Sequence, residues 1–126
     1  MSAFYKIDKE RRLVLSSGTG VLNKEDILGH MDRLSKDPDF DPEFSQVSDF
    51  TQLTGLDIEP EDVRQIAHRN LFSPRSRRAF VVKDDLQYGF ARMFQIHREL
   101  NGEEGIRVFR IFDEALDWIL VGKADS

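Results

Sequence analysis

Histidine, arginine and aspartate are the residue types in this chain that could carry chemistry. The only histidines are His30, His68 and His97, and they fall on three different predicted helices. None of them has the His-x-x-x-His spacing that places two zinc ligands on one helical face, so no metal site is predicted. His97 lies on the apolar side of its predicted helix. Both a core histidine with one hydrogen-bond partner and a histidine in a ligand pocket fit that position.

Arginines form one dense cluster in the sequence, at Arg69, Arg75, Arg77 and Arg78, with a proline-containing loop among them. We interpret the cluster first as a run of solvated charges. The second interpretation is that Arg75, Arg77 and Arg78 bind an anion or an acidic partner, since guanidinium groups form paired hydrogen bonds with carboxylates and phosphates. The formal net charge of −5 opposes general binding to nucleic acid, and no stretch resembles a recognition helix. No nucleic-acid partner is predicted.

Two carboxylates, Asp49 and Asp57, are candidates for acid-base catalysis. No nucleophile or electrophile accompanies them in a recognisable motif, so capping and turn roles are the simpler interpretation. The glycines in Gly18-Thr19-Gly20 lack the remaining residues of a phosphate-binding loop. We therefore predict no catalytic residue and no cofactor, and enzymatic activity is a third hypothesis behind two binding functions.

The stretch from Ser76 to Leu100 predicts the element around which the chain is organised. Ala79-Phe80-Val81-Val82 has no alternating polar residue, which is typical of a parallel strand covered on both faces. A long helix follows, because apolar residues then recur at helical spacing. These are Leu86, Phe90, Met93, His97 and Leu100.

A Phe-rich interior between this helix and the sheet is the predicted ligand pocket. Phe90, Phe94 and His97 would line it. Tyr88 and Arg92 are four residues apart on the other side of the helix. They would form an exposed stacked pair, a pocket mouth or a subunit contact.

The remaining elements complete an α/β pattern. Strands on either side of residues 8–11 predict an N-terminal hairpin, and Asn23 would cap a first helix that ends near Lys36. A strand within 44–51, a second helix starting at Pro60, a last strand at 106–111 and a final helix capped by Asp113 follow. This order predicts one α/β domain over residues 1–126, with a mixed, mostly parallel sheet of about five strands and about four helices.

The composition of the chain also predicts the cellular compartment of this domain. No cysteine is present among the 126 residues, and charges fill the first residues, where a signal peptide would be apolar. No window has the ~18 apolar residues of a membrane span. A cytoplasmic protein without a membrane span is predicted.

The order of elements, with the stretch from Asp49 to Asp57 leading into a helix, resembles the STAS domain of anti-sigma-factor antagonists of the SpoIIAA type. The runs Asp37-Pro38-Asp39-Phe40, 73–82 and 88–93 resemble more closely the bacterial SpoIIAA-like group, most of which has no assigned function. That group is also likened to CRAL-TRIO lipid-binding domains. The resemblance covers nearly the whole chain.

The resemblance implies a non-catalytic regulatory or protein-interaction domain that binds a partner or itself, with a homodimer as one form. The implied partner-binding residues are Asp49, Thr51, Asp57, Glu59 and Arg64. The family's phosphorylated serine is replaced here, since Ile58, Glu59 and Pro60 follow Asp57. The CRAL-TRIO likeness implies the alternative, a carrier of a small apolar ligand or lipid.

Overall fold

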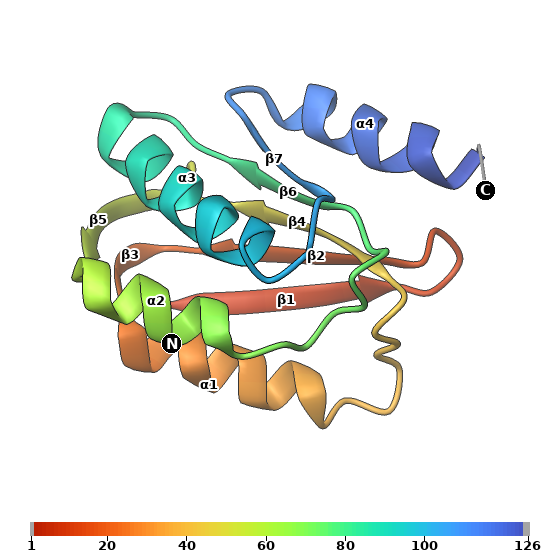
Figure 1. The fold of residues 1–126 in the computed structure, drawn as a ribbon, viewed down its shortest axis with the longest axis horizontal. Helices are drawn as coiled ribbons and strands as arrows, with labels where there is room; N and C mark the ends of the chain where they lie inside the picture. Colours follow the sequence, from red (N-terminus) through yellow and green to blue (C-terminus); the bar gives the residue numbers. More distant parts are fainter. Residues whose placement is uncertain (1, 125–126) are drawn as a thin grey trace.

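A five-stranded sheet forms the middle of the molecule in the computed structural model, which describes residues 2–124 (Figure 1). The strands lie in the spatial order β1 (Ala3–Asp8), β2 (Leu13–Gly18), β4 (Ser45–Asp49), β6 (Arg78–Val81) and β7 (Ile106–Phe109). β1 and β2 are antiparallel, and the other neighbouring pairs are parallel. The α/β class and the N-terminal hairpin predicted from the sequence are confirmed.

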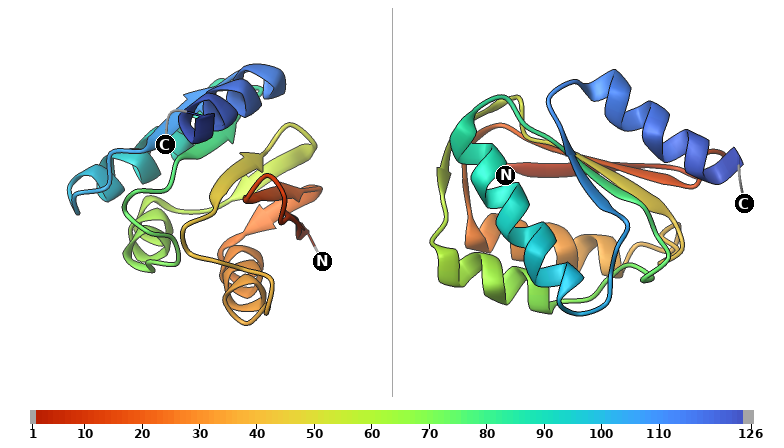
Figure 2. Two further views of the ribbon diagram at one scale, coloured as in Figure 1. Left: turned by 90° about the vertical axis from the view of Figure 1, so that its right-hand side faces the viewer. Right: turned by 45° about the horizontal axis from the view of Figure 1, so that its top comes forward.

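The described helices divide unequally between the two faces of this sheet (Figure 2). α1 (Lys24–Ser35), α2 (Pro60–His68) and α3 (Asp85–Glu99) cover one face, and α4 (Phe112–Ala124) covers the other. Phe80 packs among side chains of the first three helices, whereas Ala79 and Val81 pack against α4. β6 is therefore buried on both faces, as its unbroken apolar run predicts.

α1 begins where its cap predicts. The Asn23 side chain accepts a hydrogen bond from the backbone N–H of Asp26, and the Asp26 carboxylate accepts one from the N–H of Asn23. This reciprocal pair satisfies two backbone donors that the first turn leaves free. The helix ends at Ser35 with Lys36 as its C-cap.

A second, two-stranded sheet was not predicted. β3 (Gly20–Asn23) pairs in parallel with β5 (Leu53–Asp57), beside the carboxyl end of the main sheet. Both strands contain glycine and end in Asn or Asp, residues that are depleted in strands, so the local pattern indicates turns instead. The start of α4 was also misplaced. The helix begins at Phe112, which puts Asp113 in its first turn and not at the N-cap.

α3 forms as predicted but presents a different face to the sheet. Leu86 and Leu100, which the apolar spacing placed inward, are 58% and 80% exposed. The buried residues are shifted by about one position, to Gln87, Ala91, Phe94, Gln95 and Arg98. The polar members of this set find partners in the interior. The Gln87 amide donates to the Phe50 carbonyl oxygen at 3.0 Å, and the Gln95 amide donates to the Ile106 carbonyl oxygen at 2.8 Å.

Candidate functional site

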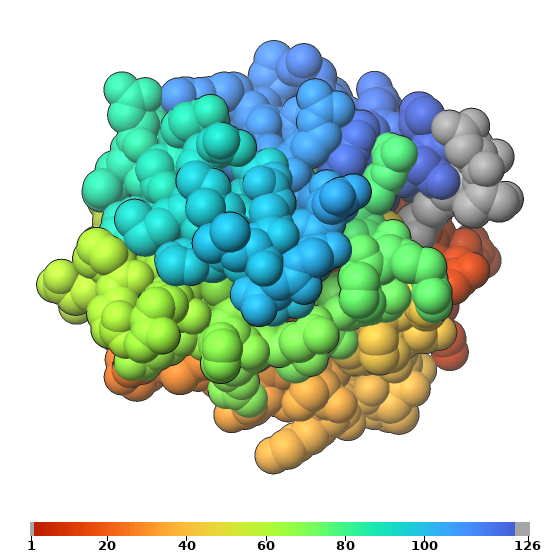
Figure 3. Space-filling model, in the orientation of Figure 1, coloured from red at the N-terminus to blue at the C-terminus, as the bar shows by residue number. Residues whose placement is uncertain are grey.

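A cavity of about 130 Å³ lies between the sheet and the three helices that cover its first face. Its lining is mostly apolar and comes from the main sheet, the small sheet and the helices, with Leu22, Met31, Phe50, Val63, Phe80 and Phe94 among its residues. Phe90 also lines it, so two of the five predicted pocket residues are present. In the space-filling view, atoms of α1, α2, α3 and residues 69–77 close over this face (Figure 3).

Polar side chains form one end of the cavity. Arg78, Gln46, Ser16 and His30 all line it and are buried. They come from β6, β4, β2 and α1, and the strand residues point to the same face because alternate residues of a strand share a side. A guanidinium group in an apolar interior carries a large desolvation cost, which its hydrogen-bond and ion-pair partners must offset.

Hydrogen bonds join these four side chains in a series that runs from Arg78 to His30. Arg78 donates from Nε and Nη2 to Oε1 of Gln46, at 3.3 and 3.2 Å. Nε2 of Gln46 donates to the Ser16 hydroxyl at 2.9 Å, and this hydroxyl lies 3.0 Å from Nε2 of His30. Since the Ser16 oxygen already accepts from Gln46, its proton is available for Nε2 of the imidazole.

The imidazole of His30 is neutral in this arrangement. Burial, and to a smaller extent the nearby Arg33, lower its pKa from 6.5 to about 4, and a hydrogen bond to the Phe4 backbone opposes this shift. A neutral imidazole accepts at one ring nitrogen and donates at the other. His30 therefore continues the chain of hydrogen bonds to the Phe4 backbone without adding a charge at pH 7.

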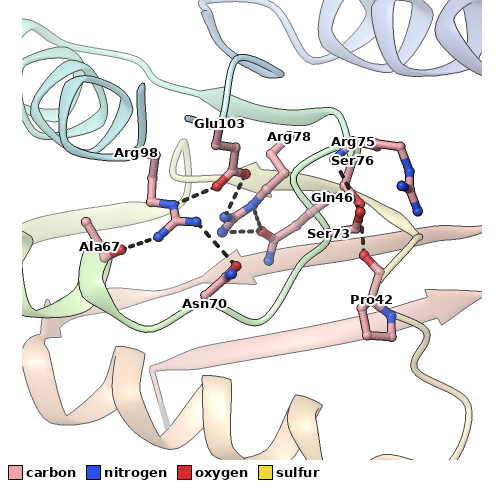
Figure 4. A network of polar contacts seen from close by, with 10 residues as sticks. All are labelled: Pro42, Gln46, Ala67, Asn70, Ser73, Arg75, Ser76, Arg78, Arg98 and Glu103. Atoms are coloured by element: carbon pink, nitrogen blue, oxygen red, sulfur yellow. Dashed lines mark hydrogen bonds and ion pairs between the residues drawn. The ribbon is translucent and has the colours of Figure 1, made fainter. Parts of the chain in front are cut away.

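A buried ion cluster lies on the other side of Arg78 (Figure 4). Nε of Arg98 donates to Oε2 of Glu103 at 2.6 Å, and Nη1 donates to the Ala67 carbonyl oxygen at 2.7 Å. Its Nη2 donates to Oδ1 of Asn70 at 3.3 Å. Arg98 is thus held by three partners and fixes the carboxylate that faces Arg78.

The cluster carries unbalanced charge. Two guanidinium groups, Arg78 and Arg98, face one carboxylate, Glu103, and the three residues are 8%, 5% and 1% exposed. Burial lowers the pKa of Arg78 to about 10; Glu103 opposes this shift and Arg98 adds to it. Arg78 therefore stays protonated at neutral pH, and the cluster has a net charge of +1.

Arg78 is also incompletely hydrogen-bonded. A guanidinium has five N–H donors, and among the described residues only the Nε–H and one Nη2–H of Arg78 make hydrogen bonds. Its Nη1 lies 3.5 Å from Oε1 of Glu103, an ion-pair distance, and that oxygen has no hydrogen-bond donor within the described chain. The rings of Phe72 and Phe94 lie 4.6 and 5.2 Å from the guanidinium carbon. Arg78 is thus a buried cation beside the cavity, and some of its N–H groups make no hydrogen bond.

The whole chain is similar in structure to an uncharacterized protein of the DUF3478 family, with a SpoIIAA-like fold, from Shewanella loihica PV-4. The alignment covers 94% of each chain at 21% sequence identity and a TM-score of 0.60. The chain has a SpoIIAA-like fold. No family model matches the sequence, and no curated protein matches it. At this identity the likeness concerns the fold alone.

The SpoIIAA-like fold separates the three arginines that their sequence positions group together. Arg75 is exposed and pairs with Glu43. Arg77 donates to the Trp118 carbonyl oxygen at 2.9 Å, and its guanidinium carbon lies 4.8 Å from the Trp118 ring centre. Arg78 alone enters the interior. Successive strand residues point to opposite faces, so adjacent arginines cannot share one site, and a solvated run describes Arg75 but not Arg78.

Three of the residues predicted for the pocket or its mouth lie outside the cavity, and His97 does so because the buried face of α3 is rotated. Tyr88 is 40% exposed and has the Arg110 guanidinium 5.3 Å from its ring centre. Arg92 donates to the Gln95 side chain at 2.6 Å, so the predicted Tyr88–Arg92 stack does not form. His97 is partly exposed and does not line the cavity. It is neither the core histidine nor the pocket histidine of the two interpretations.

The five residues implied as a partner-binding set fall into two groups in this fold. Oδ1 of Asp49 accepts from the backbone N–H and the hydroxyl of Thr51, at 2.9 and 2.7 Å, which makes these two a turn after β4. Asp57, at the end of β5, Glu59, at the N-cap of α2, and Arg64 within α2 are all exposed. Arg64 is paired with Glu61. The second group remains available as a surface.

Within residues 2–124, no cluster of three or more His, Asp or Glu side chains is arranged to hold a metal ion. No helix in that same range is long and apolar enough to cross a membrane.

Most of the polar end of the cavity, and the ion cluster beside it, were missed at the sequence level. Gln46, Ser16, Arg98 and Glu103 each resemble an ordinary surface residue in their local sequence. One signal was present. β2 and β4 contain the polar residues Ser16, Gln46 and Ser48, and an interior strand of a doubly covered sheet has no surface face to explain them.

Proposed function

We propose that the protein is a non-catalytic binding domain that carries or senses a small apolar molecule in its internal cavity. The single observation behind this proposal is the 130 Å³ cavity with its mainly apolar lining. An apolar cavity of roughly 150 Å³ in another protein binds benzene. The volume here suits a ligand of about that size.

The apolar lining of the cavity favours an apolar occupant. A bound apolar molecule would make packing contacts with the surrounding side chains. Ligand binding to the native state alone would then raise the melting temperature.

Toluene and benzamide, two neutral one-ring probes, test the proposal. We expect both to shift the backbone amide NMR signals of residues around the cavity, such as Ala91 and Phe94, and to raise Tm with concentration. An Ala91→Leu variant, which adds carbon atoms to the cavity wall, should lower the affinity for toluene at least tenfold while the protein stays folded.

Gly89→Leu is the matched control for this variant. It adds an apolar side chain to the same helix at a position where a new Cβ meets open space. Its affinity for toluene should equal that of the wild type. Failure of toluene, benzamide and benzoate all to bind the wild-type protein would overturn the proposal.

A second candidate function is protein interaction through the exposed group Asp57, Glu59 and Arg64. The observation in its favour is that all three side chains are exposed and belong to consecutive elements, with Asp57 at the end of β5, Glu59 at the N-cap of α2 and Arg64 within α2. A doubly substituted Asp57→Ala, Arg64→Ala protein should lose self-association in sizing experiments, or partner recovery in pull-downs. Unchanged assembly and recovery would count against this surface.

A further inference from the structure

The cavity has a chemical polarity that the proposed function does not use. Most of its wall is apolar, and one end presents Arg78, whose guanidinium is buried, protonated and short of partners. We propose that the cavity ligand is a small carboxylic acid, whose carboxylate binds Arg78 while its aromatic ring or short aliphatic chain fills the apolar part. This inference rests on the proposed function and specifies its ligand.

Charge balance is the first argument. The buried cluster of Arg78, Arg98 and Glu103 has one positive charge in excess. His30 contributes no charge at pH 7, because burial keeps its imidazole neutral. A bound carboxylate would neutralise the cluster, giving two cations and two anions. A neutral ligand would leave the excess charge buried, which is costly in a low-dielectric interior.

Donor geometry is the second argument. Gln46 occupies Nε and one Nη2 donor of Arg78, and Glu103 forms an ion pair with Nη1 at 3.5 Å. With Glu103 counted as the partner of one Nη1–H, two N–H groups are left over, one on each terminal nitrogen. Two terminal guanidinium nitrogens match the two oxygens of a carboxylate, so a bidentate pair uses the donors that the protein leaves unbonded.

The surroundings fix the guanidinium in place for such a ligand. Gln46 is itself held by Ser16, and Ser16 by His30, so the orientation of Arg78 is set from one side. Phe72 and Phe94 contact it as well. A cation that is held by packing and hydrogen bonds before the ligand arrives loses little conformational entropy on binding.

Volume limits the rest of the ligand. At about 130 Å³ the cavity accommodates roughly one aromatic ring, by comparison with benzene in a cavity of roughly 150 Å³. A one-ring aromatic acid or a short-chain fatty acid fits this description. A long-chain fatty acid or a phospholipid exceeds the space.

Benzoate and benzamide are the test pair, because they have the same size and differ in charge. We expect wild-type protein at pH 7 to bind benzoate at least tenfold more tightly than benzamide by isothermal titration, since hydrogen bonds to an ionised partner are about twice as strong as neutral ones. Equal affinities would overturn the acidic-ligand inference and leave the proposed function intact. Loss of binding by both, and by toluene, would overturn both proposals.

An Arg78→Met variant assigns the preference to its residue. Glu103 keeps Arg98 as its partner in this variant, so the cluster becomes neutral. We expect the benzoate preference to disappear while benzamide still binds. Arg77→Met is the matched control, because Arg77 lies outside the cavity, and it should keep the preference.

Persistence of the full benzoate preference in Arg78→Met would overturn the role of Arg78. A Glu103→Gln variant gives an independent readout if the methionine variant does not fold. It raises the net charge of the cluster from +1 to +2 and should strengthen benzoate binding without strengthening benzamide binding. An unchanged benzoate-to-benzamide ratio there would contradict the inference.

Discussion

The two faces of the sheet are built from the same strands and differ in almost every other respect. On the α4 face, Leu13, Val47, Ala79 and Val81 pack against Ala115 and Ile119 in an apolar cluster. On the opposite face, the neighbours of these residues along β2, β4 and β6 include Ser16, Gln46, Ser48 and Arg78, and a cavity lies above them. One face is therefore optimised for packing, and the other keeps space and charge that stability alone does not require.

This contrast indicates where function lies. A buried ion cluster contributes little net stability compared with apolar residues of the same volume, because desolvation offsets the attraction between the charges. An internal cavity lowers stability. Both features occur on the face covered by α1, α2 and α3, and both point to binding.

The largest expected effect comes from breaking the charge cluster on the cavity face. Glu103→Ala leaves Arg78 and Arg98 buried without their carboxylate, and we expect a loss of about 3–5 kcal/mol in the free energy of unfolding by urea denaturation. Glu104→Ala, next to it in sequence but exposed, should change stability by less than about 0.5 kcal/mol. A small loss in Glu103→Ala would mean that the cluster is not desolvated as described.

A pH dependence should follow from the neutral imidazole at the cavity's polar end. The pKa of His30 falls from 6.5 to about 4 on folding, so between these values the unfolded chain binds a proton that the folded chain does not. Stability from this group is complete above pH 6.5 and is lost as the pH falls toward 4, by about 3 kcal/mol in total.

The measurement is urea denaturation at several pH values for wild type and His30→Gln. The variant should lack this part of the acid destabilisation, whereas His68→Gln, at an exposed histidine, should retain it. Identical pH profiles for wild type and His30→Gln would show that the imidazole titrates normally.

The smallest expected effect is the difference in stability loss between two Ile→Ala variants, one on each face of the sheet. Ile119 packs on the α4 face, and Ile66 lines the cavity, where part of its surface already lacks contacts. We expect Ile119→Ala to lower the free energy of unfolding by about 3 kcal/mol and Ile66→Ala by about 1 kcal/mol less, because fewer packing contacts are lost. Equal losses, measured by urea denaturation, would argue that the cavity is filled by rearranged side chains.

Local patterns were sufficient for the elements that depend on a few neighbouring residues. The apolar run at Ala79–Val82 predicted a doubly covered strand, and Asn23 predicted the start of α1. The hairpin and the mostly parallel sheet followed from the order of such elements. In each case the physical cause, a cap, a turn or an unbroken apolar run, acts within a few positions along the chain.

The site depended on contacts between residues far apart in sequence. Gln95 and Arg98 look like surface residues on α3, and they are buried because Ile106, Ala67 and Glu103 offer partners that no local pattern reveals. These partners rotate the buried face of α3 by about one residue, which removes His97 from the predicted pocket and leaves Phe90 and Phe94 in it.

The chain's hydrophobic spacing, caps and turns were enough to specify an α/β sheet with its helices. Which arginine of the cluster would be buried, and that a cavity would open beside it, was decided only in the tertiary structure. The reason is that burial of a polar side chain depends on whether a partner from another element reaches it. The spacing of residues in the sequence does not reveal such contacts.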